Sequence, residues 1–567
     1  MYLITSPFKE LYQNKTKVIL LGHWGILPEK KENIDEIINY HWLDREKFKN
    51  DFKYLNKLII KINYQLSDLL NSFHNTSFSK EFWCLVLNPW VSMFVSAIYD
   101  RWESSIKALS INKITHVNFL KNSQNSAPED FNDYIRFYND HLWNHNVFKD
   151  IFEFINSKNI NIEYLKKTSS FKTRSYKNEK NFFIMLADKI CSIFTKKKRI
   201  MLIDHYFSFF NYCKLSLSIG QFPRYYHEFY KKIHLPKENL ESRKKLKLNL
   251  EENNFEKFIS FYLPLNLPKS FLEGFRVMIE NANKVSLDSD LIIIGNSNFP
   301  TELSKFWCAL KKEGKSKIIL NEHGGSIPIK YRYYDIHNLI FDKYISWAKP
   351  KLKNENRLTP SKLIGFEKMK LKNKDLSIIT LEDSQYAYYC KNLQSSIIME
   401  DFNQKRKLME NLRLEKIDFK IKTYKDMGWR LEDKYANLFG EKTITNKNVK
   451  SVLKQSKLVI CTYPETTFLE SMITGVPTVL LFMENIWNFD ESHYILVEKL
   501  RHNNIIFSCP DEATKHIKNI IHNPKKWWNL KNTVDARNYF LNECGNISKN
   551  WLKEWKDYIL KNNDKLN

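Results

Sequence analysis

Short runs of aliphatic and β-branched residues recur along the chain, each followed by a polar or glycine-bearing turn and then a helical pattern. This alternation is typical of strand–helix units that build a parallel sheet. The clearest runs are Val18–Leu21, Leu291–Ile294, Lys317–Leu320, Leu376–Ile379, Phe419–Lys422, Leu458–Cys461 and Thr478–Leu481. Three of them precede residue 350 and four follow it. We therefore expect an α/β protein with two Rossmann-like, doubly wound domains.

The length of 567 residues corresponds to two to four domains at about 150 residues each. Between the first run and Leu291 the pattern is mostly helical and aromatic, which predicts a helical elaboration over about 44–285. A lysine-rich stretch with Pro350 and Pro360 resembles a linker. We expect an N-terminal domain over 1–355, a C-terminal domain over 356–545, and a basic amphipathic helix with a tail over 546–567.

The charge of the chain is strongly positive, with 89 Lys and Arg against 64 Asp and Glu, a net charge of +25. A polyanion, an anionic membrane surface or a phosphorylated substrate is a natural partner for such a chain. The excess is concentrated at 166–247, where 20 basic residues face 6 acidic ones. With 43% hydrophobic residues the chain can bury large cores, which excludes a disordered protein.

The cysteines and the most apolar segment both indicate an ordinary globular interior. None of the eight cysteines forms a CxxC pair or stands at zinc-finger spacing from a histidine, so we expect scattered core thiols and no metal site. The N-terminus lacks the basic and apolar regions of a secretory signal, so we expect none. The apolar run Phe82–Tyr99 contains Asn88 and Pro89, which favours a buried helix over a membrane span.

The segment Lys457–Leu481 carries the strongest functional pattern. A buried strand turns through Tyr463 and Pro464 and enters a helix near Thr466 and Thr467, and this helix ends at Gly475. A helix N-terminus at the carboxyl end of a parallel strand offers free N–H groups and partial positive charge to a phosphate or diphosphate.

Three side chains of that segment could hold a nucleotide. Thr466 and Thr467 add hydroxyl donors, and Glu470 lies three residues after Thr467, on the same helix face, where a carboxylate can accept both hydroxyls of a ribose. With Tyr463 in the turn, these are the nucleotide-binding candidates. The alternative is an ordinary strand–helix–strand unit with a threonine cap. The order of residues resembles the donor half of GT-B type glycosyltransferases, in which two Rossmann-like domains face each other across a cleft.

In that type of enzyme the strand corresponding to Phe419–Lys422 often supplies a basic residue to the diphosphate of the donor, where it offsets charge on the leaving group. Here the strand ends in Lys422, and Arg430 follows in the next loop. Both residues join the donor-binding candidates. Lysine lacks the bidentate fork of arginine, and both side chains could equally be solvated charges on a basic protein.

The N-terminal half contains two turns with candidate catalytic residues. Glu322 and His323 end the run Lys317–Leu320, and Gly324 and Gly325 follow, where the missing side chains allow a substrate or the opposite domain to approach closely. His323 could be a general base for an acceptor hydroxyl, and Glu322 is the competing base. His23, in the turn after the first run, is a second candidate histidine.

Several motifs together resemble a family of bacterial transferases that is associated with surface-carbohydrate gene clusters. They are Leu21-Gly-His-Trp24, His41-Trp-Leu-Asp-Arg-Glu46, Asn88-Pro-Trp90, Tyr99-Asp-Arg-Trp102, Gly220-Gln-Phe-Pro223, Glu322-His-Gly-Gly325 and the segment Thr466–Pro477. The resemblance spans nearly the whole chain in matching order. It departs at two positions: His23 stands where the family pattern has an acidic residue, and Lys422 where it has arginine.

This resemblance implies a glycosyltransferase that moves a sugar from a nucleotide-sugar donor to a surface polysaccharide or lipid-linked glycan, such as lipopolysaccharide or capsule. It implies no bound metal and no cofactor beyond the substrate. The basic cluster at 166–247 fits a surface that docks on anionic lipid, so we expect a cytoplasmic protein that is peripheral on the inner membrane. A glycerol- or ribitol-phosphate transferase with a CDP-activated donor is the first alternative. A non-catalytic nucleic-acid-binding protein is the second, although no recognised nucleic-acid motif is present and we expect no such partner.

Overall fold

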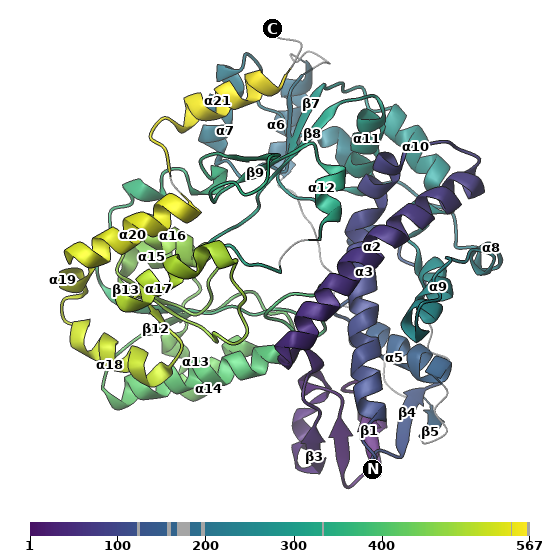
Figure 1. Cartoon of the computed structure of the whole chain (residues 1–567), viewed down its shortest axis with the longest axis horizontal. Helices are drawn as coiled ribbons and strands as arrows, with labels where there is room; N and C mark the ends of the chain where they lie inside the picture. Colours follow the sequence, from purple (N-terminus) through teal and green to yellow (C-terminus); the bar gives the residue numbers. More distant parts are fainter. Residues whose placement is uncertain are drawn as a thin grey trace.

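The computed structural model describes residues 1–121, 125–155, 160–166, 182–193, 199–331, 334–545 and 547–563, with side chains from 185 in the fourth range. The strands in these ranges form three five-stranded sheets (Figure 1). Neighbouring strands are parallel in each of the three sheets. The predicted parallel α/β class is therefore confirmed.

The first sheet has the strand order β3-β2-β1-β4-β5. The direction in which the chain adds strands reverses between β1 and β4, as in a Rossmann fold. Its strands are β1 (Tyr2–Ile4), β2 (Val18–Leu20), β3 (Ile34–Ile37), β4 (His116–Leu120) and β5 (Asn161–Leu165).

The second sheet has its strands in chain order, β10-β9-β8-β7-β6. They are β6 (Met201–Ile203), β7 (Leu291–Ile294), β8 (Lys317–Asn321), β9 (Lys343–Ser346) and β10 (Glu355–Arg357). The run at Val18 therefore does not join the runs at Leu291 and Lys317, contrary to the sequence-based grouping of these three. Its actual neighbours show no clear strand pattern, because β1 has only three residues and β3 contains Asp35 and Glu36.

The third sheet gathers the four runs that follow residue 350, as predicted. Its order is β12-β11-β13-β14-β15, and the winding reverses between β11 and β13. The strands are β11 (Asp375–Ile379), β12 (Lys420–Lys422), β13 (Ser456–Cys461), β14 (Thr478–Leu481) and β15 (Ile506–Phe507).

Two 30-residue helices, α2 (Arg45–His74) and α3 (Lys80–Leu109), run from the first sheet to the second (Figure 1). Side chains of Asp44 and Ser79 cap their first turns, as expected for residues that accept hydrogen bonds from free helix N–H groups. In the described part of the chain, α3 is the one helix long and apolar enough to cross a membrane, and its most apolar window is wholly buried in the protein. The predicted buried helix at Phe82–Tyr99 is therefore confirmed.

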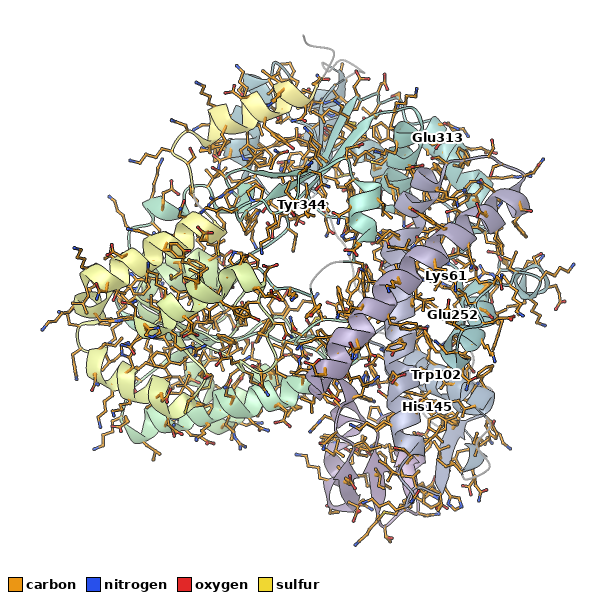
Figure 2. The ribbon with its side chains drawn as sticks, viewed as in Figure 1. Lys61, Trp102, His145, Glu252, Glu313 and Tyr344 are labelled. Carbon is orange, nitrogen blue, oxygen red and sulfur yellow. The ribbon has the colours of Figure 1, made fainter. Side chains whose placement is uncertain are left out.

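The remaining helices cover the sheets. On α2, Lys61 pairs with Glu252 at 2.7 Å, which ties this helix to the segment before α9 (Figure 2). Around the first two sheets lie α1 (Lys9–Tyr12), α4 (Phe131–Phe137), α5 (His141–Ile155), α6 (Phe182–Ile193), α7 (Phe209–Ser218), α8 (Leu240–Lys244), α9 (Asn254–Asn266), α10 (Phe275–Asn283), α11 (Glu302–Glu313) and α12 (Ile336–Ile340).

The helices that follow residue 395 belong mainly to the third sheet, and the last one leaves it. They are α13 (Ile397–Leu414), α14 (Leu431–Phe439), α15 (Val449–Gln455), α16 (Thr466–Thr474), α17 (Tyr494–His502), α18 (Pro510–Ile520), α19 (Pro524–Trp528), α20 (Lys531–Cys544) and α21 (Trp551–Asn562). Trp555 and Ile559 of α21 pack into the core of the second sheet, so the C-terminal helix joins the second and third sheets (Figure 1).

Candidate functional site

The carboxyl edge of the third sheet has the form that the sequence predicts. β13 ends at Cys461, α16 begins at Thr466, and Gly475 ends the helix in the left-handed conformation at φ 71°. The residue before the helix, Glu465, makes no side-chain hydrogen bond to the first turn. Because the winding reverses between β11 and β13, this helix N-terminus lies at the place where open α/β sheets bind ligands.

The two threonines at the start of α16 differ in their surroundings. Thr467 is buried, and its Oγ1 lies 2.7 Å from the hydroxyl of Tyr463, which is also buried. Thr466 is only partly buried. The hydrogen-bonded pair of Thr467 and Tyr463 therefore stabilises the buried side of the turn. Thr466 is the more accessible threonine at the sheet edge.

Glu470 is buried, with 6% of its surface exposed, and its Oε1 lies 3.7 Å from Nζ of Lys362. Burial raises the pKa of the Glu470 carboxyl, and the Lys362 ammonium opposes this rise. Lys362 comes from the segment that links the second and third sheets, and the sequence analysis did not select it. Its only signal was a lysine within a proline-bounded linker.

The turn of residues 322–325, called here the Gly-Gly turn, meets α16 directly. A Cβ atom on Gly324 would lie 2.4 Å from Oγ1 of Thr466, so any larger residue would force Thr466 or the turn to move. The segment after the Gly-Gly turn also contacts the third unit of the chain, because the Lys330 N–H donates to the Asn488 carbonyl at 2.8 Å. The structure therefore brings together the two segments that the sequence analysis singled out in separate halves of the chain.

The two candidate bases in this turn have different partners. Glu322 accepts the backbone N–H of Trp347 through Oε2 at 2.7 Å. His323 is exposed, and its Nδ1 lies 2.5 Å from the hydroxyl of Tyr206, which follows β6. Tyr206 was not among the predicted site residues, because nothing in the sequence indicated that β6 lies in the same sheet as β8.

His23 lies at a different contact, between the first and third sheets. Its backbone N–H donates to Ser396 Oγ at 3.1 Å. Burial and the nearby Lys434 ammonium lower the pKa of its ring, so the ring is neutral at pH 7. Its buried Nδ1 has no hydrogen-bond partner among the residues the structure describes.

Of the two predicted basic residues, Lys422 is the better placed. It ends β12, is half-buried, and pairs with no acidic side chain in the described part of the chain. Arg430 is exposed and is held by Asp433 at 2.7 Å. The loop between them is fixed by Glu382, which accepts the backbone N–H groups of Met427 at 2.8 Å and Trp429 at 3.0 Å.

Glu382 follows β11 at the same sheet edge and was not predicted. Only 2% of its surface is exposed, and burial raises the pKa of its carboxyl to about 7, an effect that the two backbone hydrogen bonds oppose. Its signal in the sequence was an acidic pair just after a predicted strand, in a loop where no helical pattern begins.

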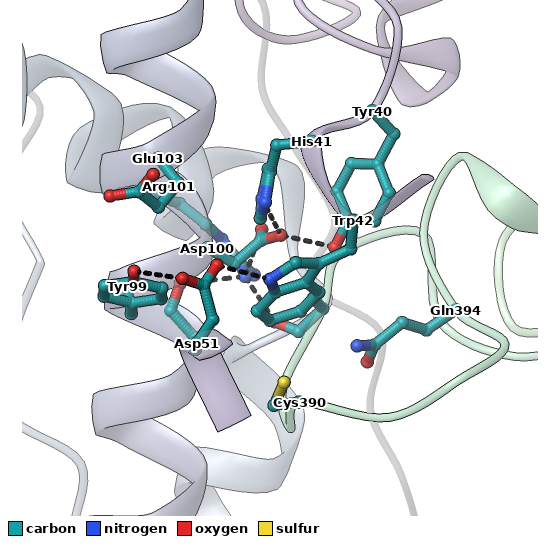
Figure 3. A network of polar contacts seen from close by, with 12 residues as sticks. Tyr40, His41, Trp42, Asp51, Tyr99, Asp100, Arg101, Glu103, Cys390 and Gln394 are labelled. Carbon is teal, nitrogen blue, oxygen red and sulfur yellow. Dashed lines mark hydrogen bonds and ion pairs between the residues drawn. The ribbon is translucent and has the colours of Figure 1, made fainter. Parts of the chain in front are cut away.

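A buried polar network joins α3 and the segment before α2 to the loop that follows β11 (Figure 3). Asp100 accepts from Tyr40 at 2.5 Å and lies 3.0 Å from His41. Arg101, with no exposed surface, bonds Asn144 at 2.8 Å and the backbone carbonyl of Ala387. Asp100 and Arg101 therefore belong to a buried structural network.

The described residues contain one group of side chains at metal-ligand spacing, Asp188, His227 and Glu228. Arg224 already pairs with Asp188 at 2.8 Å and with Glu228 at 2.6 Å. The guanidinium supplies the positive charge that these carboxylates need, so the group is a structural ion-pair network. All eight cysteines are free, and five of them are buried.

The comparison with known families decides the identity. The profile of the LIC12162 family transferases matches residues 1–559. The chain belongs to this transferase family. No curated protein matches the chain. The family match covers both the Gly-Gly turn and α16, so both lie within the transferase unit.

Solved structures show only remote likeness. TarM is 12% identical, with a TM-score of 0.30, over 48% of this chain and 55% of that one. MurG of Acinetobacter baumannii is 11% identical, with a TM-score of 0.33, over 65% of this chain and all of that one. The wall teichoic acid polymerase TagF is 10% identical, with a TM-score of 0.33, over 68% and 94%. The group that this transferase moves must therefore be argued from its own geometry.

Proposed function

We propose that this transferase is a glycosyltransferase of the GT-B type, which moves a sugar from a nucleotide-sugar donor to a surface polysaccharide or lipid-linked glycan. The observation that carries the proposal is the contact of Gly324 with Thr466, which sets the carboxyl edge of the second sheet against the start of α16. A donor bound at the switch point of the third sheet would thus have its reacting end beside Glu322 and His323.

The donor roles follow from the surroundings of each residue. The N-terminus of α16 and the Thr466 hydroxyl would bind the diphosphate, and Lys422 would offset the charge that develops as it leaves. Glu470 would accept the ribose hydroxyls, in exchange for part of its contact with Lys362. These positive groups replace the charge of a metal ion, so the reaction proposed here needs none.

We assign proton acceptance to His323 and orientation of the turn to Glu322. The Glu322 carboxylate is engaged with the Trp347 N–H, whereas the His323 ring is exposed and oriented by Tyr206. An imidazole ring is a common general base for an acceptor hydroxyl.

A thermal-shift panel of UDP, GDP, CDP, CMP and dTDP tests the donor site, because a ligand that binds only the folded state raises apparent stability. We expect one nucleoside diphosphate to raise the melting temperature, and Thr466→Val to abolish that rise. The matched control is Thr514→Val, which changes a buried threonine on α18 whose hydroxyl bonds only its own helix, and this variant should keep the rise. No shift with any nucleotide would overturn the proposal.

The products separate the two transferase alternatives. A glycosidic bond in the product supports the proposal, whereas a phosphodiester made from a CDP-activated donor would replace it with the glycerol- or ribitol-phosphate transfer. Strong, salt-dependent binding of single-stranded nucleic acid without nucleotide binding would instead favour the non-catalytic alternative.

We also propose that the protein works at the cytoplasmic face of the inner membrane, with part of 166–247 against anionic lipid. Residues 167–181 and 194–198 lie outside the described residues, so the support comes from α6 and α7. These helices expose Leu186, Ile190, Ile193, Phe209, Phe210 and Leu217. Exposed Lys189 and Lys214 lie on the same two helices, a combination typical of surfaces that dock on anionic bilayers.

Sedimentation with vesicles of anionic or neutral lipid tests this surface. Phe209→Ser with Phe210→Ser should reduce pelleting with anionic vesicles, as should replacement of Lys196, Lys197 and Lys198 by serine. Leu414→Ser is the matched control, because Leu414 is 81% exposed on α13, far along the chain from this surface. Unchanged pelleting of both variants would contradict the membrane role.

A further inference from the structure

A pocket of about 510 Å³ lies beside the third sheet, at the amino ends of β11 and β13. One wall is the segment 365–370, which precedes β11, and the other is α15, which leads directly into β13 (Figure 1). Four of its seven lining residues are lysines: Lys368, Lys370, Lys450 and Lys454. None of the lining residues of this pocket, called here the lysine pocket, belongs to the candidate site.

The positive charge of the lysine pocket is not balanced. All four lysines are exposed, and none of their ammonium groups forms an ion pair with an acidic side chain among the residues that the structure describes. The lining itself contains no aspartate or glutamate in the described part of the chain. Glu367 lies next to Lys368 in the chain but outside the lining, and its Oε2 accepts the Gly365 N–H at 3.0 Å. A concave site lined by charges of one sign concentrates the electric field and attracts counter-ions.

The backbone fixes the two walls of the pocket against each other. The Lys372 N–H donates to the Lys454 carbonyl at 2.7 Å. Two residues further on, the Lys374 N–H donates to the Gln455 carbonyl, also at 2.7 Å. On α15, Lys450 and Lys454 are four residues apart and lie on the same face, where like charges repel and destabilise a helix. The fold therefore holds these charges together against their repulsion, and a bound anion would remove that repulsion.

The lining also indicates the kind of anion. It has no aromatic side chain among the described residues, so neither a nucleobase nor a sugar ring has a surface there on which to stack. Met369 contributes the one apolar side chain of that lining, which is too little for insertion into a bilayer. Lysine ammonium groups bind phosphate as point charges, and four of them together suit several phosphate groups. The volume is within the roughly 300–1,000 Å³ of small-molecule sites.

The lysine pocket is separate from the candidate donor site. It adjoins the amino ends of β11 and β13, whereas α16 begins after the carboxyl end of β13. The six residues of β13 span about 20 Å at 3.3 Å per residue. A ligand that fills a pocket of about 510 Å³ does not reach both ends of this strand.

We propose that the lysine pocket binds a small anion with two or more phosphate groups, at a second site apart from that of the donor nucleotide. The ammonium groups of Lys368 and Lys370 hold this anion from one wall of the pocket, and those of Lys450 and Lys454 hold it from the other. The inference goes beyond the proposed transfer reaction and does not depend on it.

Chemical acetylation of lysines tests the site residue by residue, because a bound anion favours the protonated ammonium, which does not react. We would treat the full chain with acetic anhydride, with and without inorganic tripolyphosphate, at an ionic strength of about 0.15 M that screens exposed charges. Mass spectrometry of the peptides gives the rate at each lysine. The four pocket lysines should react several-fold more slowly with tripolyphosphate, and the exposed Lys525 and Lys526 on α19 should react at an unchanged rate. Inorganic monophosphate should protect the pocket lysines only at higher concentration, because it carries fewer charges.

Lys450→Gln with Lys454→Gln should lower the affinity for tripolyphosphate about 10-fold or more, because two charged hydrogen bonds are lost. The concentration of tripolyphosphate that half-protects the two remaining pocket lysines measures this affinity. Lys525→Gln with Lys526→Gln is the matched control, since it removes the same charge from exposed positions outside the pocket and should leave the affinity unchanged.

The two phosphate-binding sites should fail independently of each other. The variant with Lys450→Gln and Lys454→Gln should keep the thermal shift by the donor nucleotide. Thr466→Val, which should abolish that shift, should keep the protection of the four pocket lysines by tripolyphosphate.

Any of four results would overturn the inference. The first is unchanged reactivity of the pocket lysines at every concentration of tripolyphosphate, and the second is equal protection of Lys525 and Lys526, which would indicate general screening. The third is equal affinity of the parent and the Lys450→Gln and Lys454→Gln variant. The fourth is stronger protection by single-stranded nucleic acid than by tripolyphosphate at equal phosphate concentration, which would make the pocket part of a surface for a polymer. A donor panel without any response would remove the proposed function and leave this inference in place.

Discussion

A Cβ atom placed on Gly324 would lie 2.4 Å from Oγ1 of Thr466, so the end of β8 and the start of α16 touch across the junction of the second and third sheets. The two residues are 142 positions apart in the sequence. Their contact places the candidate base His323 beside the candidate phosphate site at the start of α16. Replacing Gly324 by alanine, which adds one methyl group, tests this contact.

Gly324→Ala should separate these two segments. Overpacking of a close contact typically costs about 1–3 kcal/mol, and here the strain falls on the junction that forms the proposed site. We expect a large loss of transfer activity with only a modest fall in melting temperature. Gly314→Ala is the control, because a Cβ there meets atoms no closer than 3.5 Å. Full activity of Gly324→Ala would mean that the contact is dispensable.

Glu470→Ala should abolish binding of the donor nucleotide and leave the protein folded. The carboxylate is buried, and its removal leaves Lys362 without its partner, so a small loss of stability is expected as well. Isothermal calorimetry with the nucleotide from the panel measures the affinity. Unchanged affinity would remove Glu470 from the donor site.

Lys422 and Arg430 should behave differently although both are basic residues near the same edge. Lys422→Ala should lower kcat by about 10-fold or more, because no described acidic side chain already neutralises this half-buried ammonium. Arg430→Ala should change kcat by less than about 2-fold, since Arg430 is exposed and paired with Asp433. Steady-state kinetics of both variants measures the two losses of kcat. A larger loss in Arg430→Ala than in Lys422→Ala would assign the diphosphate contact to Arg430 instead of Lys422.

Glu382 should make stability depend on pH. Because its pKa is raised from 4.5 to about 7, the folded state holds the proton more tightly than the unfolded chain. The stabilisation is complete below about pH 4.5 and is lost as the pH rises through about 7, by at most about 3 kcal/mol. Chemical unfolding of Glu382→Gln should show a flatter curve than the parent between these values. If the stability of the parent and of Glu382→Gln changed equally with pH, a group other than Glu382 would cause the pH dependence.

Arg101 should be essential for stability and not for the chemistry. Arg101→Met leaves the Asp100 carboxylate without its ion pair in a fully buried place, which typically costs about 3–5 kcal/mol. Replacement of Asp100 by Asn in the same chain should recover part of this loss, because the buried charge is then gone. Chemical unfolding measures both variants, with the exposed Arg136→Lys as the control.

Local sequence patterns were sufficient to predict those strands and helices whose own residues define them. Each predicted run after residue 350 is a strand of the third sheet, and α16 begins at Thr466 and ends at Gly475 as predicted. The buried helix at Phe82–Tyr99 also follows from its own residues, because a continuous apolar segment must be covered by protein or lipid, and Asn88 and Pro89 favour protein.

Strand grouping depended on long-range pairing. β1 and β6 have three residues each, and these residues become strands because partners 16 or more positions away offer hydrogen bonds. The sequence therefore suggested two sheets where the described chain has three. The same limit hid Tyr206 and Lys362, because each reaches the site from a segment whose place in the fold has no local signal.

The sequence by itself determined the parallel α/β class, the strand–turn–helix at Thr466 and the glycine pair at 324–325, since these follow from periodicity, capping and the conformational freedom of glycine. Only the tertiary structure decided that Gly324 lies on Thr466, that His23 faces Ser396 instead, and that Lys368 and Lys450 line one pocket. The physical reason is that proximity between residues of different elements is set by the packing of whole sheets, which no local pattern encodes.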